Sequence, residues 1–592
     1  MGFGVQIGNE FLKLKPGAKM EFEQENPFLQ FEDAVKGDVS IPFDVPNDQA
    51  GVNMRLLQFA SVLQQRVKAV GIDAIVYDGD NQHSFGKIRI ERSQINLNRP
   101  SASSVSCFYL SGVSSFYKEI QGLKLRTMNF GGIRTFPLTD FTHVRDGSQG
   151  FWQHVHQVID APPGSYDYAF FPVINRSWTS GHATDLMNRM TLENGLPIYN
   201  ADPTQGNVNR SYTPLVPFPY LRYVLKQAFA SVGWELQGEI LDDPDFKKIV
   251  LICFRAIDFQ ISGATEVKFN LADSLPNITL SAFLIALKNR FAWGYEFDRS
   301  NKVVYIKPLA VLGQRVKDFT RFVAPSIGKP VATERKGFSL KNEWSGAQPS
   351  QETINLQGYE YKGITDSYLT IPAPGPAIEN WCYLIAADNS YYYCAQDPDT
   401  NVWYWALVAA NVYDVVGPGE ATEIVTSACV ASNERWDEYH DTIPRIDMEG
   451  YWAGPPSFRN SGYWSDEKND DWGIYLTFYH GLRNNRSGQP IPFASHHIYD
   501  PCGIQVGNWS LAFEGKRQSD HEEIGLINRW NRVADIFKSS EQLELSFNLP
   551  LDEFNDLRFS DAIVVDGVRM YITKMRSTVP YSGTISCDCI RI

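Results

Sequence analysis

Residues 275–308 read LPNITLSAFLIALKNRFAWGYEFDRSNKVVYIKP, and this stretch decides how the rest of the chain is interpreted. Thr279 is a favoured residue type for a helix N-cap. The apolar residues after it recur at helical spacing: Leu280, Phe283, Leu284, Leu287 and Phe291. Gly294 suits the left-handed position that ends a helix. Residues 295–298 and 303–306 flank a polar turn and predict a hairpin that covers Leu284 and Leu287.

A second copy of this pattern lies in residues 220–254. Its apolar stripe consists of Leu221, Val224, Leu225, Ala228 and Val232. Gly233 would end that helix, and Gly233-Trp234-Glu235-Leu236 parallels Gly294-Tyr295-Glu296-Phe297. A polar turn at 242–245 and a strand at 249–254 complete the unit. Helix–glycine–strand units also arise by chance, but the shared order predicts an internal repeat.

Length and composition favour a folded protein of several domains. The chain has 592 residues, of which 43% are hydrophobic, 13% aromatic and 21% charged. The net charge is −14 and no basic cluster is present, so a dedicated nucleic-acid binder is not expected. The abundant aromatic residues suit β-structure and large protein interfaces.

The N-terminal sequence MGFGVQIGNEFLKLK lacks the apolar core of a signal peptide, which predicts folding in a cytoplasm. The longest apolar run, residues 402–410, falls short of the ~20 residues that a membrane helix needs. The 8 cysteines include no CxxC pair. Cys587 and Cys589 share one face of a predicted strand, and buried free thiols are expected.

The fold class predicted is α+β, predominantly β, with several domains. The expected organisation is a β domain with one helix (1–135), a β or irregular region (136–215), two helix–glycine–hairpin units (216–310), a linker with β segments (311–359), an inserted β-meander (360–440) and a β-rich domain with one helix (441–592). The helix of the first domain is expected over about 53–70, and no long helix is expected before Tyr220. Asp566-Gly567 predicts a hairpin turn.

The best metal candidate is His154-x-His156, because two histidines at that spacing on a strand point the same way. His143 or His182 could supply a third ligand. Packing or surface histidines explain the pattern more simply, since the spacing defines no complete ligand set. His496 and His497 would face opposite sides of a strand and form a weaker candidate.

Two acidic groups are further candidate sites. Asp397, Asp399 and Asn401 match the start of a calcium loop, but Val402 and Val408 replace the required glycine and glutamate. Acidic residues near Trp464 and Trp472 would suit a glycosidase, but a solvated loop explains them better, without further assumptions: Asp466, Glu467, Asp470 and Asp471. No nucleotide-binding, hydrolase or metalloprotease motif is present. No enzyme activity, catalytic residue, cofactor or metal is therefore predicted.

Several segments, taken in order, carry a resemblance to a known family: 41–46 (IPFDVP) with Asn53, 77–79 with 86–88, 221–234, 275–306, 525–527 with Trp530, 549–551, and 565–567 with 571–572. Together they span nearly the whole chain, and residues 360–440 match least. In these segments the chain resembles the large tail-tip or baseplate hub proteins of tailed phages and prophages of Bacteroidetes.

The resemblance implies a structural virion protein that joins the tail tube to a central spike or tip. It implies tube-like β-barrel domains, two per chain, and three copies in a ring. Implied partners are tail-tube or distal tail proteins, the tape-measure protein and the spike, in a tail made in the host bacterial cytoplasm. The alternative is a receptor- or carbohydrate-binding tail protein, with glycan degradation as one option, supported by the aromatic residues around 381–405 and the acidic residues of 466–471. A secreted adhesin is disfavoured by the missing signal peptide. Residues 360–440 are expected to project from the ring and contact a neighbouring tail protein.

Overall fold

The structure is a computed structural model of the chain. It describes residues 3–29, 39–57, 71–94, 104–138, 149–175, 186–199, 214–257, 265–298, 301–345, 359–415, 422–446, 472–513, 517 and 520–591, with short gaps inside several of these ranges. Strands dominate, helices are few, and the buried side chains form several clusters. The predicted α+β, mainly β, multidomain fold class is confirmed.

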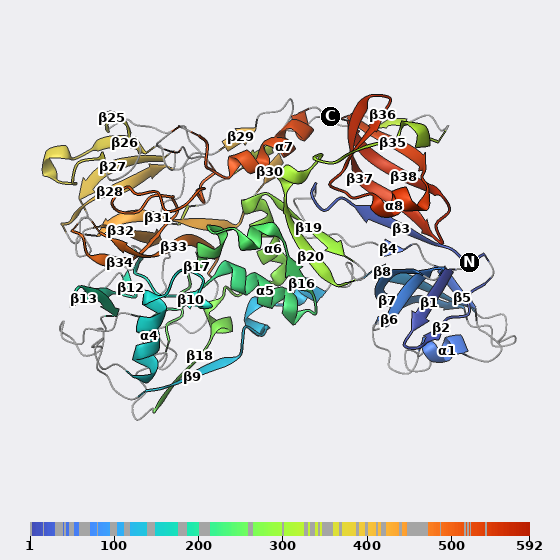
Figure 1. The fold of residues 1–592 in the computed structure, drawn as a ribbon, viewed down its shortest axis with the longest axis horizontal. Coiled ribbons are helices and arrows are strands. Elements are labelled where there is room, and N and C mark those ends of the chain that lie inside the picture. Colours follow the sequence, from blue (N-terminus) through green and yellow to red (C-terminus); the bar gives the residue numbers. More distant parts are fainter. Residues whose placement is uncertain are drawn as a thin grey trace.

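A fourteen-stranded sheet joins the two ends of the chain (Figure 1). Its path runs β2-β1-β6-β7-β8-β4-β3-β37-β38-β35-β22, with β5, β21 and β36 attached beside it. The strands are β1 (Phe3–Ile7), β2 (Glu10–Phe11), β3 (Met20–Glu25), β4 (Val39–Ser40), β5 (Phe43–Pro46), β6 (Ile72–Asp78), β7 (Asn81–Gln94), β8 (Ser104–Ser111), β21 (Val316–Asp318), β22 (Lys329–Val331), β35 (Glu541–Asn548), β36 (Ala562–Val565), β37 (Val568–Val579) and β38 (Thr584–Arg591). The sheet therefore joins strands from both ends of the chain. The predicted domain boundaries stay predictions.

Two parts of this sheet have the same topology. We call β5, α1 (Val52–Leu56), β6, β7 and β8 the N module, and β35, α8 (Leu551–Asp556), β36, β37 and β38 the C module. In each, the chain runs strand, helix and three further strands. The sheet orders are β6-β7-β8-β5 and β36-β37-β38-β35, antiparallel throughout. Figure 1 shows the N module in blue below the C module in red.

The two modules also match in sequence, a repeat different from the one predicted at 220–254 and 275–308. Residues 73–79 read DAIVYDG and residues 561–567 read DAIVVDG, in the first strand and turn of each hairpin. Residues 105–107 (VSC) and 585–587 (ISC) follow in the last strand, and both cysteines are fully buried. Residues 43–46 (FDVP) and 547–550 (FNLP) precede the two helices. Shared order, topology and sequence indicate that the modules are two copies of one unit.

Strand β37 connects the modules because its two halves have different neighbours. Residues 568–571 pair with β36, and residues 574–579 pair with β3. Strand β3 in turn pairs with β4, which contacts β8 of the N module. Glu23 on β3 accepts hydrogen bonds from Lys574 and from Arg576 (3.1 Å). Burial acts to raise the pKa of Glu23, but these two cations outweigh it and lower that pKa.

The unit around 275–308 forms as expected, with one correction. Helix α6 (Leu280–Phe291) begins at Thr279, whose Oγ1 accepts from the N–H of Ala282 (3.2 Å). β19 (Trp293–Asp298) and β20 (Val303–Pro308) form the hairpin, and Leu284 and Leu287 are fully buried. The helix ends at Ala292, which adopts the left-handed conformation, and not at Gly294. Gly294 lies in β19, where Phe28 occupies the space that a Cβ would need.

The first copy of the predicted repeat differs from the second. Helix α5 (Leu221–Ser231) buries Val224 and Leu225 and is followed by Gly233 at φ 76°, as expected. Strand β16 (Glu235–Gln237), however, pairs in parallel with β20 of the other unit. The strand predicted to return to it, β17 (Ile249–Leu251), pairs with β33 instead. The predicted first hairpin is therefore wrong, because each strand bonds to a partner distant in sequence.

An eight-stranded sheet holds much of the middle of the chain, in the order β12-β11-β32-β31-β33-β17, with β24 and β34 beside it. Its other strands are β11 (Val173–Asn175), β12 (Leu186–Met187), β24 (Trp344–Ser345), β31 (Ala428–Trp436), β32 (Asp441–Ile446), β33 (Ile474–Asn484) and β34 (Pro490–Ser495). Smaller sheets pair β9 (Ile133–Pro137) with β18 (Glu266–Asn270), β10 (Tyr168–Ala169) with β15 (Phe218–Pro219), β13 (Met190–Glu193) with β14 (Leu196–Tyr199), and β23 (Phe338–Leu340) with β29 (Tyr413–Val415) and β30 (Thr422–Ile424).

The predicted meander is a separate four-stranded sheet, β25 (Glu360–Thr365), β26 (Trp381–Ile385), β27 (Ser390–Gln396) and β28 (Trp403–Ala409). Its core contains Tyr392, Cys394 and Trp405. The described strands between residues 410 and 440 do not join this sheet: β29 pairs with β23, and β31 lies in the eight-stranded sheet. Figure 1 places the four strands at the opposite end of the molecule from the N and C modules.

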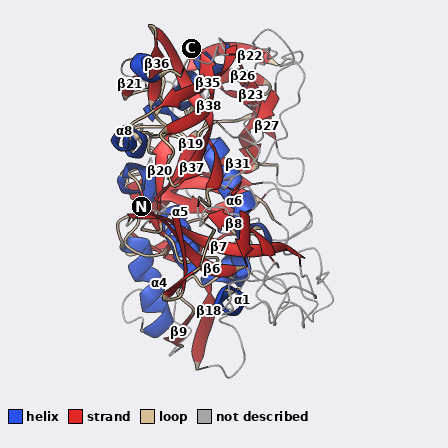
Figure 2. Ribbon diagram, turned by 90° about the vertical axis from the view of Figure 1, so that its right-hand side faces the viewer, coloured by secondary structure: helices blue, strands red, loops and turns tan. Residues whose placement is uncertain are grey.

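Helices were predicted less well than strands. Helix α4 (Gly150–Asp160) lies in a region where none was expected; it buries Phe151, Trp152, Val155, Val158 and Ile159 on one face. Residues 441–592, where one helix was expected, contain α7 (Ile527–Lys538) and the short helix α8. Of the helix expected over 53–70, only Val52–Leu56 is described, and 58–70 lie outside the described residues. Figure 2 shows α4 and α8 on one side of the molecule and β27 toward the other.

Candidate functional site

The structure separates the two histidines of the predicted metal pair. Both lie on helix α4, where residues two apart point to different sides, so the expected strand geometry is wrong. His154 stacks on Phe136 with 4.3 Å between ring centroids, and its Nε2 lies 2.5 Å from the Tyr168 hydroxyl. Burial, together with nearby Arg134, lowers the pKa of His154 to about 4. His156 is buried on the helix, and His143 and His182 lie outside the described residues.

The other histidine candidates are packing residues. His496 Nδ1 lies 3.1 Å from Asn433 Oδ1, and His497 Nδ1 accepts from the N–H of Tyr499 at 3.3 Å. A third buried histidine, His480, lies 3.1 Å from Ser495 Oγ through its Nε2. Across the described ranges, no group of three or more His, Cys, Asp or Glu side chains could hold a metal ion.

Most of the acidic candidates lie beyond what can be placed. Asp397 and Asp399 are outside the described residues, while Asn401 adopts a left-handed φ of 59°. The acidic residues between 466 and 471 and Trp464 are also outside them. Trp472 is described and is buried against Phe254 and Arg126. None of the four carboxylates that suggested a glycosidase lies among the described residues.

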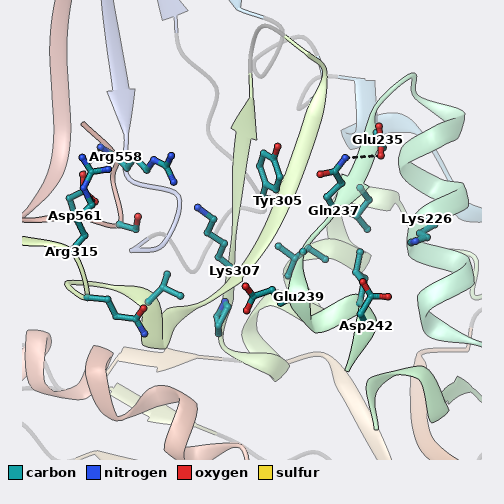
Figure 3. Close-up of a pocket in the computed structure, with 18 residues that line it drawn as sticks. Lys226, Glu235, Gln237, Glu239, Asp242, Tyr305, Lys307, Arg315, Arg558 and Asp561 are labelled. Atoms are coloured by element: carbon teal, nitrogen blue, oxygen red, sulfur yellow. Dashed lines mark hydrogen bonds and ion pairs between the residues drawn. The ribbon is translucent and has the colours of Figure 1, made fainter. Parts of the chain in front are cut away.

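A cavity of about 760 Å³ lies between the α5–β20 region and the C module (Figure 3). The segment 235–242 forms one wall, residues 305–308 of β20 form the floor, and Arg315, Arg558 and Asp561 form the opposite wall. This arrangement follows from the fold, because β21, which follows β20 along the chain, pairs with β36 of the C module.

The cavity has walls of opposite charge. Glu235, Glu239 and Asp242 lie on one wall, with Lys307 and Tyr305 between them and the arginines (Figure 3). Asp242 already forms an ion pair with Arg222 at 3.2 Å, outside the cavity. Lys307 pairs with Glu296.

On the arginine wall, Arg315 pairs with Asp556 and lies 4.0 Å from Asp561. Burial raises the pKa of Asp561, although Arg315 and the N–H of Arg558 oppose that rise. Lys317, also buried, joins the network through Glu553 (3.2 Å) and Asp556 (3.0 Å). These pairs connect β21 to α8 and hold the wall in place.

The cavity is lined largely by polar and charged side chains. Its lining contains no histidine or cysteine, and most of its charged groups already have partners.

The second candidate surface is one face of the β25–β28 sheet. Tyr359 and Tyr393 lie 4.6 Å apart by ring centroid, and Tyr361 and Tyr391 lie 6.1 Å apart. All four are partly or fully exposed, and Tyr361 keeps 45% of its surface accessible. Cys382, fully buried, lies opposite Tyr393 in the register. We call Tyr359, Tyr361, Tyr391 and Tyr393 the tyrosine face.

No helix within the described ranges is long and apolar enough to cross a membrane. The described cysteines are all free thiols, and Cys587 and Cys589 are both buried on the inner face of β38, as expected.

Comparison with known proteins gives distant structural likenesses. The chain is similar to the 43 kDa tail protein of prophage MuSo2 from Shewanella oneidensis, with a TM-score of 0.33 and 8% identity over 100% of this chain and 98% of that one. It is also similar to a tail protein from Neisseria meningitidis MC58, with a TM-score of 0.31 and 6% identity over 100% and 97% of the two chains. No protein-family model matches the sequence, and no curated protein matches it.

Proposed function

We propose that this chain is a structural hub of a phage tail, and that three copies form a ring between the tail tube and a central spike or tip. The observation that supports it is the pair of equivalent modules within one continuous sheet. Three chains carry six such modules, so a ring of three presents a nearly sixfold surface to a sixfold tube and a threefold surface to a spike. The resemblance of the sequence segments to tail hubs supports the same role.

In this proposal the protein binds other tail proteins and does not catalyse a reaction. Its partners are tail-tube or distal tail proteins, the tape-measure protein and the spike. It folds in the host cytoplasm and ends in the virion at the tail tip.

The test is the copy number and place of the chain in the particle. A tail reconstruction should show three copies around the axis, with the N and C modules alternating in the ring. Native mass spectrometry of the purified chain should show a trimer. One copy per tail, six peripheral copies, or a chain that stays monomeric at high concentration would contradict the proposal.

A receptor- or carbohydrate-binding tail protein is the second candidate, and the tyrosine face favours it. Tyrosine presents an apolar ring together with a hydroxyl, which suits both sugars and proteins. Glycan binding that disappears in Tyr361→Ala and Tyr391→Ala would favour this candidate. Turnover of polysaccharide or peptidoglycan by the purified protein would overturn the non-catalytic role.

A further inference from the structure

The internal junction between the modules has a counterpart in the N module where no described strand lies. In the C module, residues 574–576 of β37 pair with both β38 and β3, and β3 continues alongside residues 577–579. In the N module, β6 covers β7 only as far as the pair Ile72–Ile88. Among the described residues, no strand pairs with residues 90–94 of β7 on the side of β6.

The register shows that these two strand ends are equivalent. Arg92 pairs with Ser106, and Arg576 pairs with Ser586, which are the serines of the matching VSC and ISC segments. The sequence agrees, because Arg92-Ser93 corresponds to Arg576-Ser577. A long strand end with unpaired N–H and C=O groups is a template for another strand. Within the described part of the chain, residues 90–94 therefore form an acceptor edge.

The C module has a strand, β22, in the position that β3 occupies beside the N module. Strand β3 lies outside β4, which pairs with β8 at Leu110. Strand β22 lies outside β35, which pairs with β38 at the equivalent residue Ile590. Both outer strands run antiparallel to their neighbours. The outer edge of β22 thus corresponds to the edge with which β3 binds β37.

We infer that β22 of one copy pairs with residues 90–94 of β7 in the next copy, as β3 pairs with β37 within each chain. This inference rests on the proposed ring, and a second copy is the occupant because the described part of each chain has one such donor edge and one such acceptor edge. The strand directions agree, since β22 is antiparallel to β35 as β3 is to β4. Pro330 in β22 has no N–H to donate, so this junction forms fewer hydrogen bonds than β3–β37.

The register identifies a pair of residues for cross-linking. Within the chain, Glu21 lies opposite Thr578. By the equivalences above, Lys329 corresponds to Glu21 and Gln94 corresponds to Thr578. Lys329 and Gln94 should therefore face each other across the junction. Facing residues of antiparallel strands have Cα atoms about 4.5–5.5 Å apart, which a disulfide spans.

The experiment places Gln94→Cys and Lys329→Cys in the full chain, with exposed Cys502 changed to serine. After mild oxidation, a denaturing gel without reductant should show covalent species that end at three chains. The single variants Gln94→Cys and Lys329→Cys should not produce this series. Glu21→Cys with Thr578→Cys should instead form a bond inside one chain, which checks the oxidation conditions on the equivalent internal pair.

Native mass spectrometry of each reduced variant separates the possible failures. A trimer that gives no covalent series overturns the strand pairing and leaves the hub proposal standing. A chain that is monomeric without substitutions overturns both. A reduced double variant that is trimeric and cross-links only to two chains also contradicts a closed ring built through this edge.

Discussion

At the scale of single residues, close packing decides roles that local sequence suggests wrongly. Gly294 resembles a helix stop because it follows an apolar helix, yet the helix ends two residues earlier at Ala292. A Cβ at Gly294 would lie 2.4 Å from Cδ1 of Phe28, a fully buried residue from the other end of the chain. The glycine is required by this long-range contact.

Gly294→Ala should therefore destabilise the protein by about 1–3 kcal/mol, as overpacking of a core does. Urea unfolding measures this change. Phe28→Leu in the same chain should recover part of the loss by freeing space. Ala282→Ser, on the exposed face of α6, is the matched control and should change little. Equal losses in Gly294→Ala with and without Phe28→Leu would contradict the packing explanation.

Buried histidines should make the protein sensitive to acid. Burial, helped by Lys248 and Arg483, lowers the pKa of His480 from 6.5 to about 3. Burial, with His496 and His480, lowers the pKa of His497 well below 6.5. The unfolded chain binds protons on both below pH 6.5 while the folded chain does not. Stability should therefore fall as the pH drops from 6.5 toward 3, by up to ~1.4 kcal/mol per pH unit for each histidine.

Urea unfolding at about pH 7 and about pH 5 tests this expectation. His480→Gln should reduce the difference in stability between the two pH values, because glutamine does not titrate. A variant with the same pH dependence as the unmodified chain would assign the acid sensitivity to other groups.

At the scale of elements, pairing partners separate the β25–β28 sheet from the strand that follows it. The four strands pair with one another and have their own core, whereas β31 lies between β32 and β33 in the eight-stranded sheet. Residues Val430 and Ala431 of β31 are fully buried. The two segments adjoin in sequence and belong to different structural units.

Two deletions should consequently have opposite outcomes. Replacing residues 360–409 with a short flexible linker should leave a soluble chain that unfolds cooperatively. Extending the deletion to residue 435 should abolish folding, because it removes a central strand with its buried side chains. Circular dichroism and thermal unfolding compare the two. A folded product of the longer deletion would show that β31 is dispensable.

At the scale of the whole molecule, the sequence alone determined features that depend on neighbouring residues. Local periodicity and backbone preference account for the α6 stripe with its Thr279 cap and for the β19–β20 hairpin. They also account for the turn at Asp566-Gly567, where both residues have positive φ. The matching DAIV-x-DG segments were also visible in the sequence, and a search for repeats across its full length would have found them. Tertiary structure alone decided which strands pair: β16 with β20, β3 with β37, and β31 with β33. Local preference defines a strand but leaves its edges open, and the partner of each edge is selected by burial and hydrogen bonding across the whole chain.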